Sequence, residues 1–252
     1  MRKMLIAACA AAFLLAGGAA AAAEATKGGV VSSALEIGKL RIALPPGQWN
    51  VVAEHSGKAA SSDGIPNGST YKGYYLVQFD ASKRLIGTFY ARATTEPGKP
   101  VEWRDRTCQR EDTLFRTTLG GPVHSQDCLL MNHLVRYLQV KPRDLMDRAA
   151  WQWMQENEVK VPKTVLEVQE RFFKAGEYLW VNYTVNPEAV DFVPSTVTDW
   201  RQSEWHPEFV KTDPERQEYI EHLKAWALAN AKVHQAALRD NASKGEIAPY
   251  PR

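Results

Sequence analysis

Excess charge, cysteine and long apolar segments are all scarce in this sequence. The 252 residues contain 31 Lys and Arg against 29 Asp and Glu, which gives a formal net charge of +2. Nucleic-acid binders usually carry a basic patch or stripe, whereas the basic clusters here, such as Lys83-Arg84, are only pairs. The charge balance therefore indicates no nucleic-acid partner.

Short motifs of known catalytic chemistry are missing as well. The chain contains no G-x-S-x-G nucleophile elbow, no H-E-x-x-H zinc motif, no P-loop and no G-x-G-x-x-G dinucleotide fingerprint. Their absence argues against several large enzyme classes, and no cofactor is predicted. An enzyme whose residues meet only in space stays possible, because a catalytic triad is recognised by geometry rather than by sequence position.

The clearest positive feature is the N-terminal segment. The basic pair Arg2-Lys3 precedes an apolar run over residues 4–16, two glycines and an alanine tract. This order predicts a secretory signal peptide over residues 1–25, cleaved at an A-x-A site. The apolar run is shorter than the roughly 20 residues that a membrane span needs. We therefore expect a soluble mature chain without a membrane span, located in the periplasm or secreted.

Export decides how the cysteines are interpreted. Cys9 lies in the leader, so the mature chain keeps only Cys108 and Cys128. Paired thiols in an oxidising compartment favour a disulfide. The alternative is a zinc site completed by His124 and His133, but the spacing lacks the usual tight C-x2-4-C pair. We predict a disulfide and no metal.

Alternating polar and apolar residues on either side of a turn predict three hairpins. They lie at residues 39–44 with 48–53, 74–79 with 85–92, and 165–173 with 178–185. The apolar segment 128–138 is favoured as a further strand. Helical spacing of apolar residues predicts a helix over 144–157 and a longer one from Asp213-Pro214 to about residue 240.

These elements predict a single α+β domain over residues 26–242, followed by a flexible C-terminal tail over 243–252. The expected fold is an antiparallel β-sheet built from hairpins with two or more packed helices, including a long C-terminal helix. The element order, with KLRIALPPGQW early and a long closing helix, is similar to that of the PsbP-like α/β/α sandwich domains of bacterial exported proteins. The resemblance covers element order only and implies no site residues and no function.

The segment 199–208 is the richest in functional side chains, and a loop of this kind often carries function. It supplies the candidate ligand-binding residues Trp200, Trp205 and His206, to which Trp151 in the first helix is added. The structural alternative is that both tryptophans of the loop anchor it to the core. The leading hypothesis is an exported soluble cell-envelope protein, a non-enzymatic binding or accessory domain for a small molecule or an envelope protein.

A periplasmic hydrolase is the competing hypothesis. It would use carboxylates of the same loop, Asp199, Glu204 or Glu208, together with His206 as general acid and base. Such a mechanism requires two of these groups to converge in a cleft, with at least one titrating abnormally.

Overall fold

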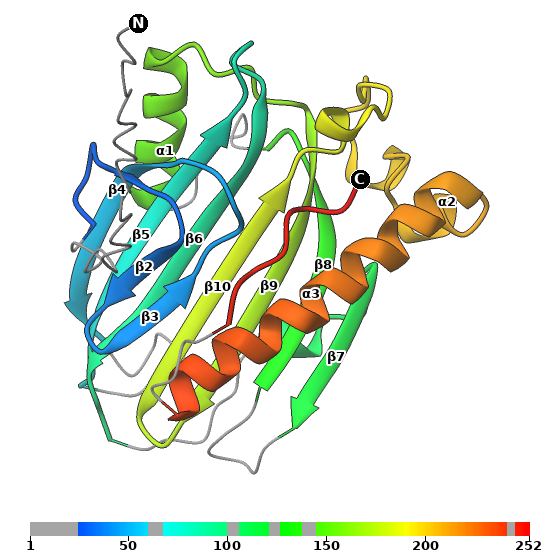
Figure 1. Ribbon diagram of the computed structural model, residues 1–252. Helices are drawn as coiled ribbons and strands as arrows, with labels where there is room; N and C mark the ends of the chain where they lie inside the picture. Colours follow the sequence, from blue (N-terminus) through cyan, green and yellow to red (C-terminus); the bar gives the residue numbers. More distant parts are fainter. Residues whose placement is uncertain (1–24, 60–67, 100–105, 121–126, 138–144, 241–244) are drawn as a thin grey trace, which may run out of the picture.

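An eight-stranded antiparallel sheet organises the chain (Figure 1). The structure, a computed structural model, describes residues 25–59, 68–99, 106–120, 127–137, 145–240 and 245–252. The predicted leader, apart from its last residue, lies outside them, as does Cys9. Across the sheet the strands run in the order β1 (Val30–Val31), β4 (Trp49–Lys58), β5 (Thr70–Phe79), β6 (Leu85–Glu96), β10 (Glu177–Val185), β9 (Thr164–Lys174), β8 (Asp127–Val135) and β7 (Phe115–Gly120).

Two of the three predicted hairpins are confirmed, and local turn chemistry explains both. Between β5 and β6, Asp80 Oδ1 accepts hydrogen bonds from the backbone N–H groups of Ser82 and Arg84 at 2.8 and 2.9 Å. Between β9 and β10 the turn uses Ala175 and Gly176 at φ 40° and 99°. A Cβ at Gly176 would approach the carbonyl oxygen of Gly98 to 2.5 Å, so this turn requires glycine. The predicted strand over 128–138 is confirmed as β8.

The third predicted hairpin, over 39–44 and 48–53, is wrong. The strand β3 (Leu40–Ala43) pairs instead with β2 (Ala34–Ile37) in a separate two-stranded sheet, while β4 pairs with β1 and β5. The connection 45–47 carries the chain from one layer to the other, with Gly47 at φ 121°. Leu40 and Ile42 are buried between this small sheet and the large one. The strand β3 therefore pairs with β2, its neighbour across the turn at Gly38, instead of with β4 as predicted.

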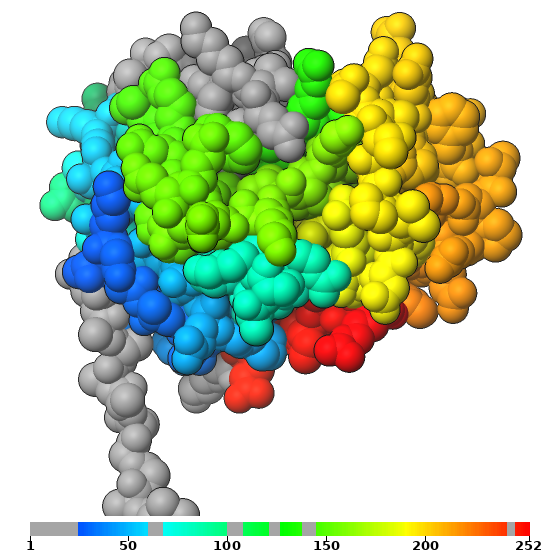
Figure 2. All heavy atoms as spheres, turned by 90° about the horizontal axis from the view of Figure 1, so that it is seen from above, coloured from blue at the N-terminus to red at the C-terminus, as the bar shows by residue number. Residues whose placement is uncertain are grey.

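Helices cover the two faces of the large sheet. The helix α1 (Leu145–Glu156) packs against β4 and β5. On the opposite side, α3 (Pro214–Asp240) packs against β8 and β9 of the large sheet and against β3 of the small one. Figure 2 shows the chain around α1 in light green and the C-terminal segment in red on opposite sides of the strand ends. The remaining helical turns are short: η2 (Arg106–Gln109), η3 (Pro187–Val190), η4 (Trp200–Gln202) and α2 (Pro207–Val210).

Both predicted helices are confirmed, and α3 begins where its capping residue places it. Asp213 Oδ1 accepts a hydrogen bond from the backbone N–H of Arg216 at 3.0 Å, and Pro214 occupies the first helical position. Leu223, Ala227 and other apolar residues at helical spacing then face the sheet. The α+β class predicted from the sequence is therefore the class observed. None of the helices in the described residues is long and apolar enough to cross a membrane.

The C-terminal residues 245–252, predicted as a flexible tail, make contacts with α3. Ile247 is 3% exposed, and the indole of Trp226 on α3 donates its N–H to the carbonyl oxygen of Ala248 at 2.9 Å. The Tyr250 ring lies 5.1 Å from that of Trp226. Residues 245–252 thus pack against α3, because the apolar side chain of Ile247 is buried and the ring of Tyr250 packs against the core.

A buried polar network fastens α3 to the sheet. His234 Nδ1 lies 2.6 Å from Glu170 Oε2 on β9, and His234 Nε2 lies 3.0 Å from the carbonyl oxygen of Ala43 on β3. Both ring nitrogens face acceptors, so both donate and the imidazole carries a proton on each. Burial lowers the pKa of His234, but the Glu170 carboxylate and the Ala43 carbonyl outweigh it and the pKa is raised overall. Further along α3, Arg239 pairs with the buried Asp127 at 2.6 Å.

Candidate functional site

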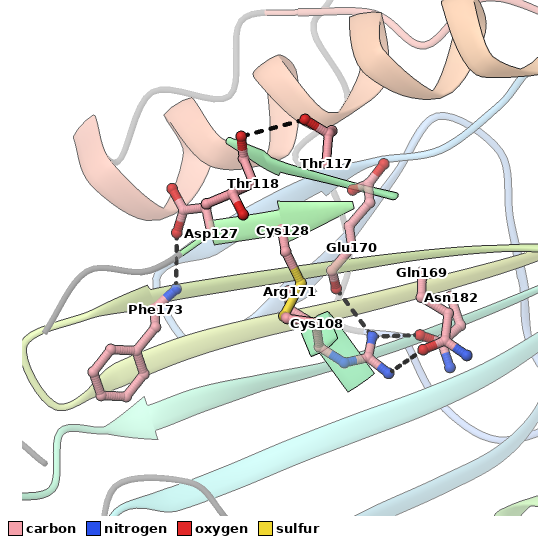
Figure 3. The surroundings of a disulfide bond; sticks show 10 residues. All are labelled: Cys108, Thr117, Thr118, Asp127, Cys128, Gln169, Glu170, Arg171, Phe173 and Asn182. Atoms are coloured by element: carbon pink, nitrogen blue, oxygen red, sulfur yellow. Dashed lines mark hydrogen bonds between the residues drawn. A yellow bond between two sulfur atoms is a disulfide. The ribbon is translucent and has the colours of Figure 1, made fainter. Parts of the chain in front are cut away.

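Cys108 and Cys128 form the predicted disulfide. Cys108 in η2 and Cys128 at the start of β8 are bonded, with their Cα atoms 5.9 Å apart. Figure 3 shows the bond beside Arg171 on the sheet. Because both sulfurs are consumed in the disulfide, the alternative zinc site that used them is wrong. Of its two histidines, His124 lies outside the described residues and His133 packs elsewhere.

The carboxylates of the segment 199–208 have separate structural partners. Asp199 caps η4 by accepting the backbone N–H of Arg201 at 2.9 Å. Glu204 accepts the hydroxyl of Ser195 at 3.1 Å. Glu208 is exposed and bonded to Lys211, which lowers the pKa of its carboxyl. Each of the three carboxylates thus has a different hydrogen-bond partner, and the hydrolase hypothesis, which also uses His206, stays a prediction.

Trp205 is a core residue. It is 1% exposed, and its ring packs edge-on against Phe192 at 4.9 Å and Tyr219 at 6.1 Å. The guanidinium of Arg216 covers it at 5.4 Å. Trp205 therefore anchors the loop to the core, as the structural alternative expects, and its ligand-binding interpretation stays a prediction.

Trp200 and His206 come together with His133 at the end of β8. The rings of Trp200 and His133 stack at 4.9 Å, and each side chain hydrogen-bonds to the backbone carbonyl of the other, at 3.3 and 3.2 Å. His206 lies edge-on to Trp200 at 4.6 Å and caps α2. Burial lowers the pKa of His133 to about 4, so this imidazole is neutral at physiological pH.

Trp151 does not join that group. It lies on α1, half-buried against the cluster of residues between α1 and the sheet, whereas Trp205 belongs to the core under α3. The four candidate ligand-binding residues are thus divided between two layers of the molecule. The ligand-binding interpretation of Trp200, His206 and Trp151 stays a prediction.

The centre of the large sheet carries a different set of functional side chains, on the face where α1 lies. The central strands β6, β10 and β9 place two cross-strand rows there, Tyr90–Asn182–Gln169 and Arg92–Trp180–Arg171. Alternate residues on the opposite face, such as Phe89 and Val181, are fully buried in the core under α3. We call the six residues the central polar face: Tyr90, Arg92, Gln169, Arg171, Trp180 and Asn182.

Polar residues at these positions are unusual for a central part of a sheet. A sheet with a helix on each face normally buries apolar side chains on both. The contacts of α1 fall on β4 and β5, to one side of the central polar face. Five of the six residues keep part of their surface accessible, and only Arg171 is buried. Partly accessible polar and aromatic side chains of this kind are typical of a binding site rather than of a hydrophobic core.

Arg171 is the structural member of the face. It is 6% exposed, and its guanidinium donates to Asn182 Oδ1 at 2.6 Å and to Gln169 Oε1 at 3.1 Å (Figure 3). The same group lies 4.9 Å from the Trp180 ring. Arg171 therefore fixes the amides of both neighbours and supports Trp180 from the β9 side.

Arg92 is held differently. Its guanidinium stacks on the Tyr71 ring at 3.6 Å and lies 5.3 Å from the Trp180 ring. Within the described part of the chain it has no ion pair with a carboxylate, and its buried Nε–H has no hydrogen-bond partner. Stacking on an aromatic face leaves the N–H edges of a guanidinium free to bind an acceptor.

The buried indole Nε1–H of Trp180, directly opposite Arg92, likewise lacks a hydrogen-bond partner in the described part of the chain. The indole N–H groups of Trp49, Trp200 and Trp226, by contrast, each donate to a backbone carbonyl. A buried donor without an acceptor costs about 1–3 kcal/mol. Two such donors, one of them cationic, thus lie on opposite residues of neighbouring strands without an acceptor in the described part of the chain.

The polar character continues one row further along β9. Glu167 accepts a hydrogen bond from Gln169 at 2.6 Å, and burial raises the pKa of its carboxyl. Asn132 on β8 lies opposite, 1% exposed, with its buried Nδ2 unpartnered within the described residues. The sequence signal for the region was the polar or aromatic residues at alternate positions within 90–92, 167–171 and 180–182, which predicted only strands.

Comparisons with known proteins add little. No family model and no curated protein matches the sequence. Among solved structures, the chain is similar to a GntR-family transcriptional regulator from Enterococcus faecalis V583 at 13% identity and a TM-score of 0.31, over 59% of this chain and 99% of that one. It is also similar to the possible transcriptional regulator YydK from Bacillus subtilis subsp. subtilis str. 168, at 10% identity and a TM-score of 0.28, over 59% and 61%. Likeness at this level carries no argument about fold or function.

Proposed function

We propose that the chain is an exported cell-envelope protein that acts by binding a small molecule on its central polar face. The observation that carries the proposal is the pair of buried N–H donors on Arg92 and Trp180, which are directly opposite each other and have no acceptor among the described residues. A bound ligand supplies a hydrogen-bond acceptor and so offsets the free-energy cost of burying both donors without a partner. The accessible surface of Tyr90 and Asn182 beside them gives the ligand a way in.

Export is supported by two independent features. The N-terminal segment has the order of basic, apolar and small residues that defines a signal peptide. The pairing of Cys108 with Cys128 fits an oxidising compartment. A binding role is favoured over hydrolysis, because the carboxylates of the 199–208 loop are each engaged with a different partner.

The experiment is a ligand screen on protein that a bacterial host has exported. The full chain is expressed, the processed protein is recovered from the periplasmic extract, and thermal unfolding is followed against a panel of small anions and their neutral analogues. A ligand that binds only the folded state raises the melting temperature. The proposal expects hits whose shift is lost in Arg92→Gln and kept in Arg201→Gln, an exposed arginine in η4.

Two results would contradict the proposal. One is retention of the full chain in the cytoplasm with free thiols at Cys108 and Cys128. The other is a set of hits whose thermal shift is the same in Arg92→Gln as in the unsubstituted protein, which would place binding elsewhere.

A further inference from the structure

We infer that the ligand of the central polar face is a monocarboxylate that carries a flat apolar group, such as an aromatic ring. This inference rests on the proposed function and goes beyond it by naming the chemistry of the ligand. It follows from the charge that the site leaves uncompensated, from the shape of its donors and from the rings that surround them.

The charge of the site points to one negative charge. Arg92 is a partly buried cation with no carboxylate partner among the described residues, and it lies between the rings of Tyr71 and Trp180. A buried charge needs a matching counter-charge, and any excess is expensive. A monoanion matches Arg92, whereas a phosphate dianion brings a second charge. The other cation of the face, Arg171, is already hydrogen-bonded to Asn182 and Gln169 and interacts electrostatically with Glu167.

The donors fit a carboxylate. A guanidinium presents its Nε–H and one Nη–H side by side, and this fork matches the two oxygens of a carboxylate. The Trp180 Nε1–H comes from the residue directly opposite on the neighbouring strand, so it can reach the same oxygens from the other side. Opposite residues of an antiparallel pair have Cβ atoms about 4.5–5.5 Å apart.

The surroundings favour a flat apolar group beyond the carboxylate. Three rings surround the Arg92 guanidinium, with Tyr71, Trp180 and Tyr178 at 3.6, 5.3 and 5.7 Å. Tyr90 lies two residues before Arg92 on the same face and keeps accessible surface. At about 3.4 Å per residue, Tyr90 is roughly 7 Å from Arg92 along the strand. A ring attached to a carboxylate spans that distance and packs against the Tyr90 ring.

The test is isothermal titration of the exported, processed protein with four probes: benzoate, phenyl phosphate, benzyl alcohol and acetate. We expect benzoate to bind most tightly, because it alone combines a single charge, a planar acceptor and a ring. Arg92→Gln is expected to weaken benzoate roughly 10- to 100-fold, and Trp180→Phe, which keeps the ring but removes the N–H, about fivefold. Arg92→Lys is expected to recover only part of the loss, because a point charge lacks the fork.

Matched controls separate a lost contact from a lost fold. Arg201→Gln and Trp153→Phe replace the same residue types away from the central polar face and are expected to bind benzoate normally. Each variant is checked by its thermal unfolding curve. Should Arg92→Gln fail to fold, Trp180→Phe carries the test alone, because it preserves the stacking of the Arg92 and Arg171 guanidinium groups on an aromatic ring.

The outcomes distinguish the inference from the proposed function. If phenyl phosphate or benzyl alcohol binds more tightly than benzoate and Arg92→Gln abolishes that binding, the site stands and the ligand class is overturned. If none of the four binds at millimolar concentration, the ligand class is again overturned, and the broad thermal screen alone tests the site. Benzoate binding that is unaffected by both Arg92→Gln and Trp180→Phe overturns the inference and the proposed site together.

Discussion

Replacing His234 with leucine tests the buried network that fastens α3 to the sheet. In the native protein both ring nitrogens of His234 donate, one to Glu170 and one to the carbonyl of Ala43, and neither His234 nor Glu170 has exposed side-chain surface. Removing one partner of a buried pair leaves the other uncompensated, which costs about 3–5 kcal/mol. Domains are stable by only about 5–15 kcal/mol, so a large share of the stability is lost.

Urea unfolding followed by tryptophan fluorescence measures this loss. With a slope near 2 kcal/mol per molar urea, the midpoint of unfolding should fall by roughly 2 M in His234→Leu. The double replacement Glu170→Leu with His234→Leu should recover most of it, because apolar residues of similar volume tolerate the same site without a stranded charge. A midpoint that moves by less than about 0.5 M in the single variant, or a double variant worse than both singles, would refute the reasoning.

The same pair sets the direction of a pH dependence. The pKa of His234 is raised in the folded protein above its ordinary value of about 6.5 by Glu170 and the Ala43 carbonyl, in spite of burial. The folded state therefore binds the proton more tightly than the unfolded state. This contribution to stability is complete below about pH 6.5 and is lost as the pH rises through the folded-state pKa. In His234→Leu this part of the dependence should vanish.

Three further predictions concern single features of the fold. Replacing both Cys108 and Cys128 with serine should lower the free energy of unfolding by about 3 kcal/mol, because the unfolded chain is no longer constrained by a closed loop. Urea unfolding measures this loss. If reducing the disulfide in the unsubstituted protein leaves its free energy of unfolding unchanged, the prediction is contradicted. Trp205→Ala should cost about 3–5 kcal/mol through the cavity it leaves, with benzoate affinity retained in the folded fraction. Asp213→Ala should cost about 1 kcal/mol by uncapping α3, and an unchanged melting temperature would argue against the cap.

Those parts of the fold that depend on local chemistry were predictable from the sequence. The β5–β6 and β9–β10 hairpins follow from alternation around a turn that its own residues close, as Asp80 and Gly176 do. The helix α3 follows from its cap and its apolar spacing. The disulfide follows from the predicted compartment, because only two thiols remain after the leader.

Features that depend on which strands become neighbours were not predictable. The alternation over 39–53 is compatible with several partners, and only the fold shows β3 paired with β2. Likewise, Arg92 and Trp180 are far apart in sequence, and nothing local indicates that β6 and β10 pair with these two residues opposite each other. Sequence reasoning therefore looked for a site in the 199–208 loop, where functional residues are close in the chain.

The most direct test of the central claim follows the indole N–H of Trp180 by NMR as benzoate is added. The cross-peak is assigned by its absence in Trp180→Phe. The account predicts that this indole proton moves downfield and saturates with benzoate, because it gains an acceptor that none of the described residues provides, and that the movement is lost in Arg92→Gln. A Trp180 cross-peak that stays in place while benzoate binds, or one that moves equally in Arg92→Gln, would contradict it.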